Sequence, residues 1–178
     1  MSSRLRRRPW RTLRIPPEVK SQVVGLVLSA ADEDRDALSA AILSGQLFER
    51  PNSLYLPNIL PTYCGLLSRE ALDGAPVSEE AVRDFFPEVE AAAQAMPVEI
   101  ERVTLSMWLR LLAGVDPSKP AYYRRPEDYD LIGVCAPLAI AGAAARKAQW
   151  LRPQLEVYYD ALQRILEHST RLNRSWAR

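Results

Sequence analysis

The strongest hydrophobic pattern in the chain lies in its last third. Residues 131–145 form an almost unbroken apolar run, with acids at 127–130 before it and Arg146 and Lys147 after it. Acids before a helix and bases at its end both suit the helix dipole. The run is shorter than the ~20 apolar residues of a membrane span, and Pro137 interrupts it. We therefore expect a buried core helix and no membrane association.

A second helix, amphipathic rather than buried, is predicted after this run. Its apolar residues recur near the helical period of 3.6. They are Leu151, Leu155, Tyr158, Leu162, Ile165, Leu166 and Leu172. The two helices, joined at 150–153, are expected to form a buried C-terminal hairpin on which the rest of the chain packs. Small residues such as Gly142 would let neighbouring helices approach it closely.

Helical spacing also predicts the elements near the start of the chain. Pro16-Pro17 suits the first turn of a helix. Its buried face would consist of Val19, Val23, Leu26, Val27 and Ala30. A second helix is predicted between a cap at Asp32 or Asp34 and a stop at Gly45.

The middle of the chain is richer in prolines and harder to assign. Residues 50–61 contain three prolines, and we interpret them as an extended crossover, since proline disfavours helix before and around itself. A third helix would then be capped by Thr62 and end at Asp73-Gly74. These features predict a connection laid across the core before the helices resume.

Two further helices are predicted before the last third. Ser78 precedes two acids, a combination typical of a helix start, and Pro87 would break or kink this helix. A central apolar helix is expected from Met96-Pro97 to Gly114, with Trp108 buried. No segment shows the alternation of a strand. The pattern predicts an all-α fold: one domain of six or seven helices over residues 16–178, preceded by a basic arm at 1–15.

Composition is compatible with an ordinary globular core. The chain has 178 residues, of which 48% are hydrophobic and 25% charged, and a chain of this length needs no disulfide staples. Cys64 and Cys135 both lie in apolar contexts, so we expect buried thiols and a cytoplasmic location. Abundant Ala, Arg and Leu favour a GC-rich bacterial source. The basic start resembles a signal peptide, but its apolar run is short and Glu18 and Lys20 intrude.

The N-terminal arm is the strongest functional signal. Residues 1–15 hold six arginines and no acid, whereas the net charge of the chain is only +1. The candidate binding residues are Arg4, Arg6, Arg7, Arg8, Trp10, Arg11 and Arg14. The arginines could neutralise phosphates while Trp10 stacks on a base, or they could pair with carboxylates of a protein partner. A solvated tail is the remaining interpretation.

A second candidate surface lies in the loop before the apolar run. It interleaves basic and aromatic residues, namely Lys119, Tyr122, Tyr123, Arg124 and Arg125. Such a group could bind an anion or serve as an interface hot spot. We favour a structural role instead, with the arginines paired to the acids at 127–130.

No catalytic or metal-binding motif stands out. Glu156, Asp160, Arg164 and His168 step by four along one helix face. The positive charge of Arg164 opposes a metal there, and Glu156 and His168 are about 18 Å apart at 1.5 Å per residue, so we expect a solvated ion-pair ladder. Neither cysteine has a nearby base, and nucleotide and zinc motifs are missing. We predict neither a metal nor a cofactor.

These observations leave three hypotheses about function. The first is a non-enzymatic accessory subunit that docks through its arm onto a larger bacterial assembly. The second is a nucleic-acid-binding protein of a regulatory, phage or defence system, whose arm contacts phosphates. The third, an enzyme or apolar-ligand carrier with a pocket among the helices, has no positive support in the sequence.

Overall fold

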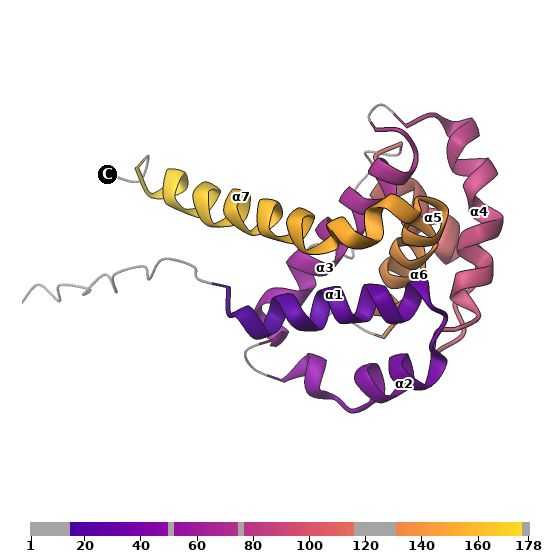
Figure 1. The fold of residues 1–178 in the computed structure, drawn as a ribbon, viewed down its shortest axis with the longest axis horizontal. Coiled ribbons are helices and arrows are strands. Elements are labelled where there is room, and N and C mark those ends of the chain that lie inside the picture. The colour runs from indigo at the N-terminus through magenta and orange to yellow at the C-terminus, as the bar shows by residue number, and fades with distance from the viewer. Residues whose placement is uncertain (1–14, 50–51, 75–76, 116–130, 176–178) are drawn as a thin grey trace, which may run out of the picture.

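The described part of the chain is entirely helical, as predicted. A computed structural model describes the backbone of residues 15–49, 52–74, 77–115 and 131–175, and these form seven α-helices and two 3-10 segments with no strand (Figure 1). The elements are α1 Pro17–Ala31, α2 Arg35–Leu43, η1 Gln46–Phe48, α3 Asn52–Ala71, α4 Glu79–Ala93, α5 Arg102–Ala113, α6 Leu131–Lys147, η4 Gln149–Gln154 and α7 Leu155–Ser175. All seven α-helices contribute to one contiguous hydrophobic core, which confirms a single all-α domain.

Helix α6 is the centre of this domain. Every residue from Gly133 to Ala145 is buried, which confirms the predicted core helix. Helices α1, α3, α4 and α5 pack around it (Figure 1). Along the described segments, no single helix has the length and apolar character needed to cross a membrane; α6 reaches that threshold only together with residues 149–168, from which it is bent by 112°.

Helices α1 and α6 approach each other closely at Gly142. A methyl group built on Gly142 would come within 2.7 Å of the carbonyl carbon of Ala30 and 2.8 Å of its Cβ and oxygen. Side-chain carbons do not approach other atoms this closely, so only glycine fits at this position. The two helix backbones therefore meet with no side chain between them.

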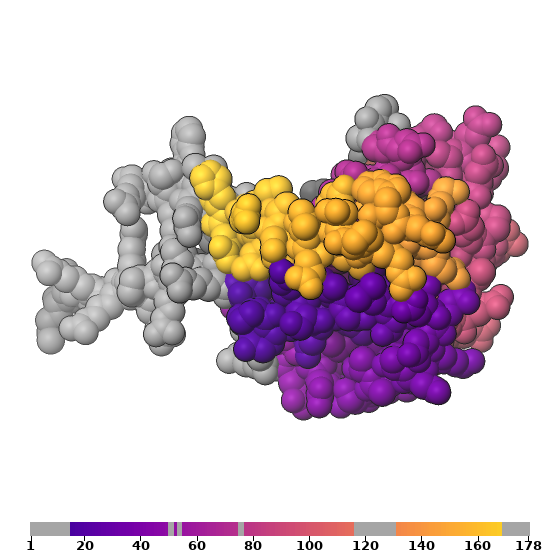
Figure 2. All heavy atoms as spheres, viewed as in Figure 1, coloured from indigo at the N-terminus to yellow at the C-terminus, as the bar shows by residue number. Residues whose placement is uncertain are grey.

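Helix α7 follows α6 but does not run back along it. The bend of 112° directs α7 across α1, where the two helices form adjacent layers of the surface (Figure 2). Leu155 and Leu162 face the core, as predicted, but the fully buried tyrosine is Tyr159, whereas the predicted Tyr158 is only partly buried. Ile165, which we expected on that face, is 62% exposed. The predicted hairpin is thus a buried helix followed by an amphipathic one, with an open angle between them.

Several helix ends have the predicted capping residues. Helix α1 begins at Pro17 with Pro16 in the extended region before it. The side chains of Asp34 and Ser78 accept hydrogen bonds from the backbone N–H groups of Ala37 and Ala81, at 3.0 Å each. Gly114 ends α5 with a φ of +78°, a conformation that glycine adopts without strain.

The predicted extended crossover at 50–61 is wrong for the residues described there. Residues 52–61 are the first half of α3, which contains both Pro57 and Pro61. The buried positions are Leu56, Ile59, Leu60, Tyr63, Cys64 and Leu67, a helical spacing that continues through the prolines. Each interior proline loses one helical hydrogen bond, and burial of this face offsets that loss. Thr62 caps nothing; its hydroxyl donates to the carbonyl of Asn58 at 2.7 Å.

Two other boundaries differ from the prediction. Helix α4 continues through Pro87 to Ala93 instead of breaking there. Helix α5 begins at Arg102, not at Met96-Pro97. A residue that precedes proline is restricted away from the helical region, and Met96 is accordingly part of a turn that buries its side chain.

Two tyrosines in the core face each other with different hydrogen bonding. The rings of Tyr63 and Tyr159 form an edge-to-face pair with centroids 5.6 Å apart. The Tyr63 hydroxyl donates to the carbonyl of Leu155 at 2.7 Å. The Tyr159 hydroxyl is buried with no partner among the described residues. Burial raises the pKa of Tyr159 to about 12, and the nearby charge of Asp160 adds to this shift.

We expect Gly142→Ala to destabilise the protein by about 1–3 kcal/mol, because the new methyl group would force α1 and α6 apart. Gly25→Ala is the matched control. Gly25 is an exposed glycine within α1 with no atom near its added Cβ, so this substitution should stabilise the helix by about 0.5–1 kcal/mol. Urea unfolding followed by circular dichroism measures both. Equal effects of the two substitutions would contradict the close contact.

We expect Tyr63→Phe and Tyr159→Phe to change stability in opposite directions. Tyr63→Phe removes a buried hydrogen bond and should cost about 0.5–1.5 kcal/mol, whereas Tyr159→Phe removes an unpaired buried hydroxyl and should be neutral or stabilising. Because the folded pKa of Tyr159 is raised above its ordinary value of 10.0, only the unfolded state ionises between pH 10 and about 12, and the free energy of unfolding falls over this range. Tyr159→Phe should therefore reduce the loss of stability between pH 10 and 12, as measured by urea unfolding. An unchanged alkaline profile would contradict this.

Candidate functional site

The binding residues predicted from the sequence lie outside the described part of the chain. They are Arg4, Arg6, Arg7, Arg8, Trp10, Arg11 and Arg14 of the arm and Lys119, Tyr122, Tyr123, Arg124 and Arg125 of the loop. Both groups stay predictions. The structure does show the residues from which the arm starts and the surface that the helices present.

The arm starts from a fixed point on the domain. Ile15, the first described residue, is only 5% exposed and belongs to the core. Shortly after it, the Lys20 ammonium lies 2.8 Å from Asp160 Oδ1 and 3.3 Å from Glu156 Oε2 on α7. The hydrogen bond to Asp160 raises the pKa of Lys20. The first part of α7 is therefore joined to α1 close to the point where the arm begins.

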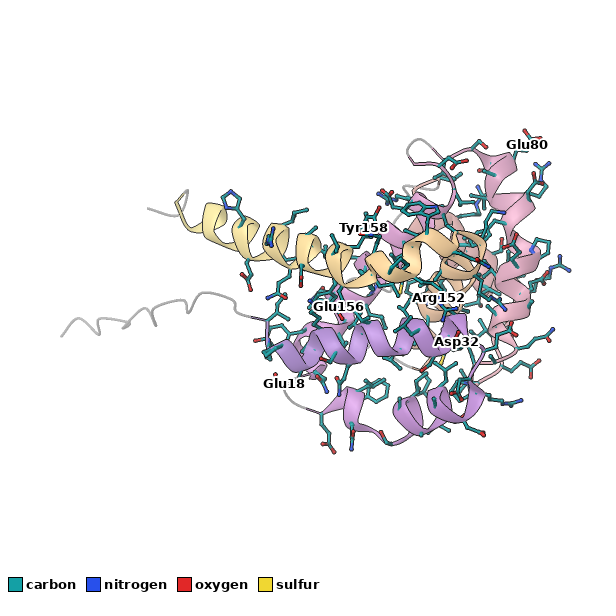
Figure 3. The ribbon with its side chains drawn as sticks, in the orientation of Figure 1. Glu18, Asp32, Glu80, Arg152, Glu156 and Tyr158 are labelled. Carbon is teal, nitrogen blue, oxygen red and sulfur yellow. The ribbon has the colours of Figure 1, made fainter. Side chains whose placement is uncertain are left out.

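This contact modifies the predicted ion-pair ladder on α7. Glu156 and Asp160 pair with Lys20 of another helix, and the side chain of Glu156 lies between α7 and α1 (Figure 3). The ladder was predicted within one helix, since a sequence shows only neighbours along the helix. His168 lies on an exposed part of α7. The stripe thus joins two helices through Lys20.

The described surface contains an open groove of about 390 Å³. It lies between the start of α2, the end of α4, the turn at 94–101 and the start of α5, and we call it the α2–α5 groove. Ala93, Val98 and Ile100 supply partly exposed apolar lining, whereas Met96 and Leu105 beneath them are each 2% exposed. Arg35, Glu90, Glu99 and Arg102 supply charged lining. The groove thus combines apolar surface with several charges.

One pair of these charges is internally neutralised. Arg102 Nε lies 3.1 Å from Glu90 Oε1, and its guanidinium carbon lies 5.4 Å from the centre of the Phe86 ring. The ion pair and the cation–π contact both orient the Arg102 side chain. Arg102 and Glu90 together contribute a fixed wall with no net charge.

The remaining charges near the groove are mostly negative. Asp34 and Asp36 flank Arg35, and Glu101 follows Glu99 by two residues; all five side chains are exposed. None of the five has an ion-pair partner within the described ranges. Of the four carboxylates, Glu99 lines the groove, and Asp34, Asp36 and Glu101 directly adjoin lining residues in the sequence; we call these four the acidic rim. Together with Arg35 they carry a net charge of −3, from four acids and one base.

The groove is lined by charged, amide and apolar residues. Among the described residues, its lining contains no histidine, cysteine, serine, threonine or tyrosine. In the part of the chain that the structure covers, no group of three or more His, Cys, Asp and Glu residues could hold a metal ion. Apolar surface beside carboxylates suits a partner that has both an apolar and a cationic group.

Sequence reasoning missed this groove because its walls come from distant segments. Arg35 is 55 residues before Glu90, and only the packing of α2 against the α4–α5 connection brings them together. One signal was visible: residues 32–36 contain four acids and one base, a dense acidic segment beside a predicted helix start. Nothing in the sequence indicated what this segment would face.

Comparisons of this chain with family models, curated proteins and solved structures gave no significant match. Its function is therefore argued from its own residues and geometry.

Both cysteines are expected to be chemically inert in the folded protein. Cys64 and Cys135 are fully buried, and burial raises the pKa of Cys64, which suppresses the reactive thiolate. Iodoacetamide at pH 8 should modify neither thiol in the native protein and both in guanidinium chloride, as counted by mass spectrometry. Rapid labelling of either cysteine in the native protein would reopen the hypothesis of a cysteine nucleophile.

Proposed function

We propose that this chain is a non-enzymatic, cytoplasmic subunit of a larger bacterial assembly that docks through its arginine-rich arm, residues 1–15. The observation that carries this proposal is the fixed root of the arm. Ile15 is buried in the core, so a segment with six arginines and no acid begins directly at a rigid surface. A partner that binds the arm would therefore be held close to the domain.

The residue types of the arm suit a protein partner. A guanidinium group donates paired hydrogen bonds that match the two oxygens of a carboxylate. Tryptophan and arginine are the residues most enriched at energetically dominant positions of interfaces. Arg8, Trp10 and Arg11 place both types within four consecutive positions. The expected partner surface is acidic with an apolar recess.

The domain itself supports a binding role over a catalytic one. The α2–α5 groove offers carboxylates, guanidinium groups and apolar surface. Both cysteines are buried, and His168 lies on exposed helix surface. A recognition surface can be built from such residues without any group that forms or breaks a bond.

Nucleic acid is the alternative partner that the arm's charge favours. Six arginines could neutralise several phosphates, and such binding weakens steeply as salt concentration rises. The arm would then act through charge density, with Trp10 stacking on a base. The two proposals differ in the chemical class of the bound species, which can be identified directly.

We expect substitution of two arm arginines to abolish recovery of the partner. The bait proteins, used in extracts of source cells at moderate salt, are the wild-type chain and the double variant Arg6→Ala/Arg7→Ala. The matched control is Arg83→Ala/Arg164→Ala, which removes the same charge from exposed positions on α4 and α7. Recovery of a stoichiometric protein should fall at least about tenfold with the arm variant and be unchanged with the control.

Two outcomes would count against an accessory subunit. The first is recovery of nucleic acid without protein. If this nucleic acid is lost with the arm variant and at raised salt, the arm binds nucleic acid. Equal loss with the control variant would show that binding depends on overall charge and not on the arm.

A further inference from the structure

We propose that the α2–α5 groove binds the arm of a second copy of this chain, with Trp10 in the groove and its neighbouring arginines against the acidic rim. This inference rests on the proposal that the arm is a docking element, and it names one surface on which the arm docks.

The size and lining of the groove fit a single large side chain. Its volume of about 390 Å³ is near the lower end of the ~300–1,000 Å³ of typical ligand pockets, so it has room for an anchor residue but not for a folded segment. Ala93, Val98 and Ile100 line it with partly exposed apolar surface. Trp10 is the only aromatic residue among residues 1–15, and an indole ring buries a large apolar area.

Charge complementarity connects the arm with this face of the domain. Residues 1–15 carry +6 and the whole chain carries +1, so residues 16–178 carry −5 (1 − 6 = −5). Arg8 and Arg11 lie on either side of Trp10 in the sequence. With the indole ring in the groove, their guanidinium groups would reach the acidic rim, where four carboxylates lack ion-pair partners among the described residues.

Arg35, which has no ion-pair partner among the described residues, does not oppose this occupant. Arg35 lines the same groove, and a guanidinium group over the face of an indole ring is attractive. Arg102 is already neutralised by Glu90 at 3.1 Å. The groove thus accepts an aromatic ring between cations while its rim attracts the arginines beside that ring.

The geometry favours a second copy over the chain's own arm. The arm starts at the N-terminal end of α1, whereas Arg35 and the groove lie past the C-terminal end of that helix (Figure 1). Five residues separate Trp10 from Ile15 and span at most about 18 Å, which is less than the roughly 22 Å length of α1. The backbone at Trp10 of the same chain therefore stops short of the groove, and a neighbouring copy has no such restriction.

The test is self-association of the purified full-length chain, followed by sedimentation equilibrium over a range of concentrations. Trp10→Ala removes the anchor, and Ala93→Trp fills the groove without changing charge. Each should weaken self-association at least about tenfold, the effect of losing a dominant interface residue. Trp150→Ala is the control, because Trp150 is 53% exposed and lies outside the groove; it should associate as the wild type does. Thermal melts establish that each variant is folded.

Mixing the two variants gives the decisive result. Trp10→Ala retains an intact groove and Ala93→Trp an intact arm, so an equimolar mixture should associate although neither variant does so alone. Glu99→Arg, which reverses one rim charge, should weaken association independently of groove filling.

Three results would overturn the inference: a wild-type chain that stays monomeric, association that persists in Trp10→Ala, or a mixture that stays monomeric. A monomeric wild type that still recovers a protein partner through its arm would overturn this inference and leave the proposed function standing. Self-association through the groove with no other partner recovered would support this inference and count against the proposed function.

Discussion

The rest of the structure depends on how closely α6 can be approached. Gly142 permits the backbone of α1 to lie directly against α6, and the atoms of Ala30 occupy the space that any side chain would need. Short side chains bury less apolar area per residue than leucine does. Helix α6 offsets this because neighbours enclose it so fully that every residue from Gly133 to Ala145 is buried. Gly142 thus sets the spacing between α1 and α6.

Charged residues at the C-terminal end of α6 link this packing to the surface. Arg146 pairs with Glu33, Lys147 Nζ lies 3.1 Å from Glu88 Oε1, and Arg152 of η4 pairs with Asp32 (Figure 3). Exposed pairs of this kind contribute about 0–1 kcal/mol each, so their main effect is to orient. Two of them hold the turn between α1 and α2, which leads directly into Arg35. The position of the groove edge therefore follows from the way α6 ends.

Sequence periodicity predicted the fold class, the core helix and most helix ends, because these depend on local spacing and capping. Sequence periodicity failed at α3. There we gave more weight to Pro57 and Pro61 than to the helical spacing of Leu56, Leu60 and Leu67. Proline costs a helix one hydrogen bond, but burial of a whole face can exceed that cost. The Lys20–Asp160 contact and the groove join residues far apart in the chain. No local pattern encodes such pairs, so the candidate site could be found only in three dimensions.

The two proposals constrain each other, because both use the same arm. If Trp10 occupies the groove of a second copy, it cannot at the same time dock on the partner in the larger assembly. Two binding events that exclude each other are negatively coupled, and each lowers the apparent affinity of the other. Free copies would then shield one another's arms, and a partner would have to displace that contact before binding. The acidic rim would thus act as a substitute for the partner's surface, and the strength of self-association would set the partner concentration at which the assembly forms.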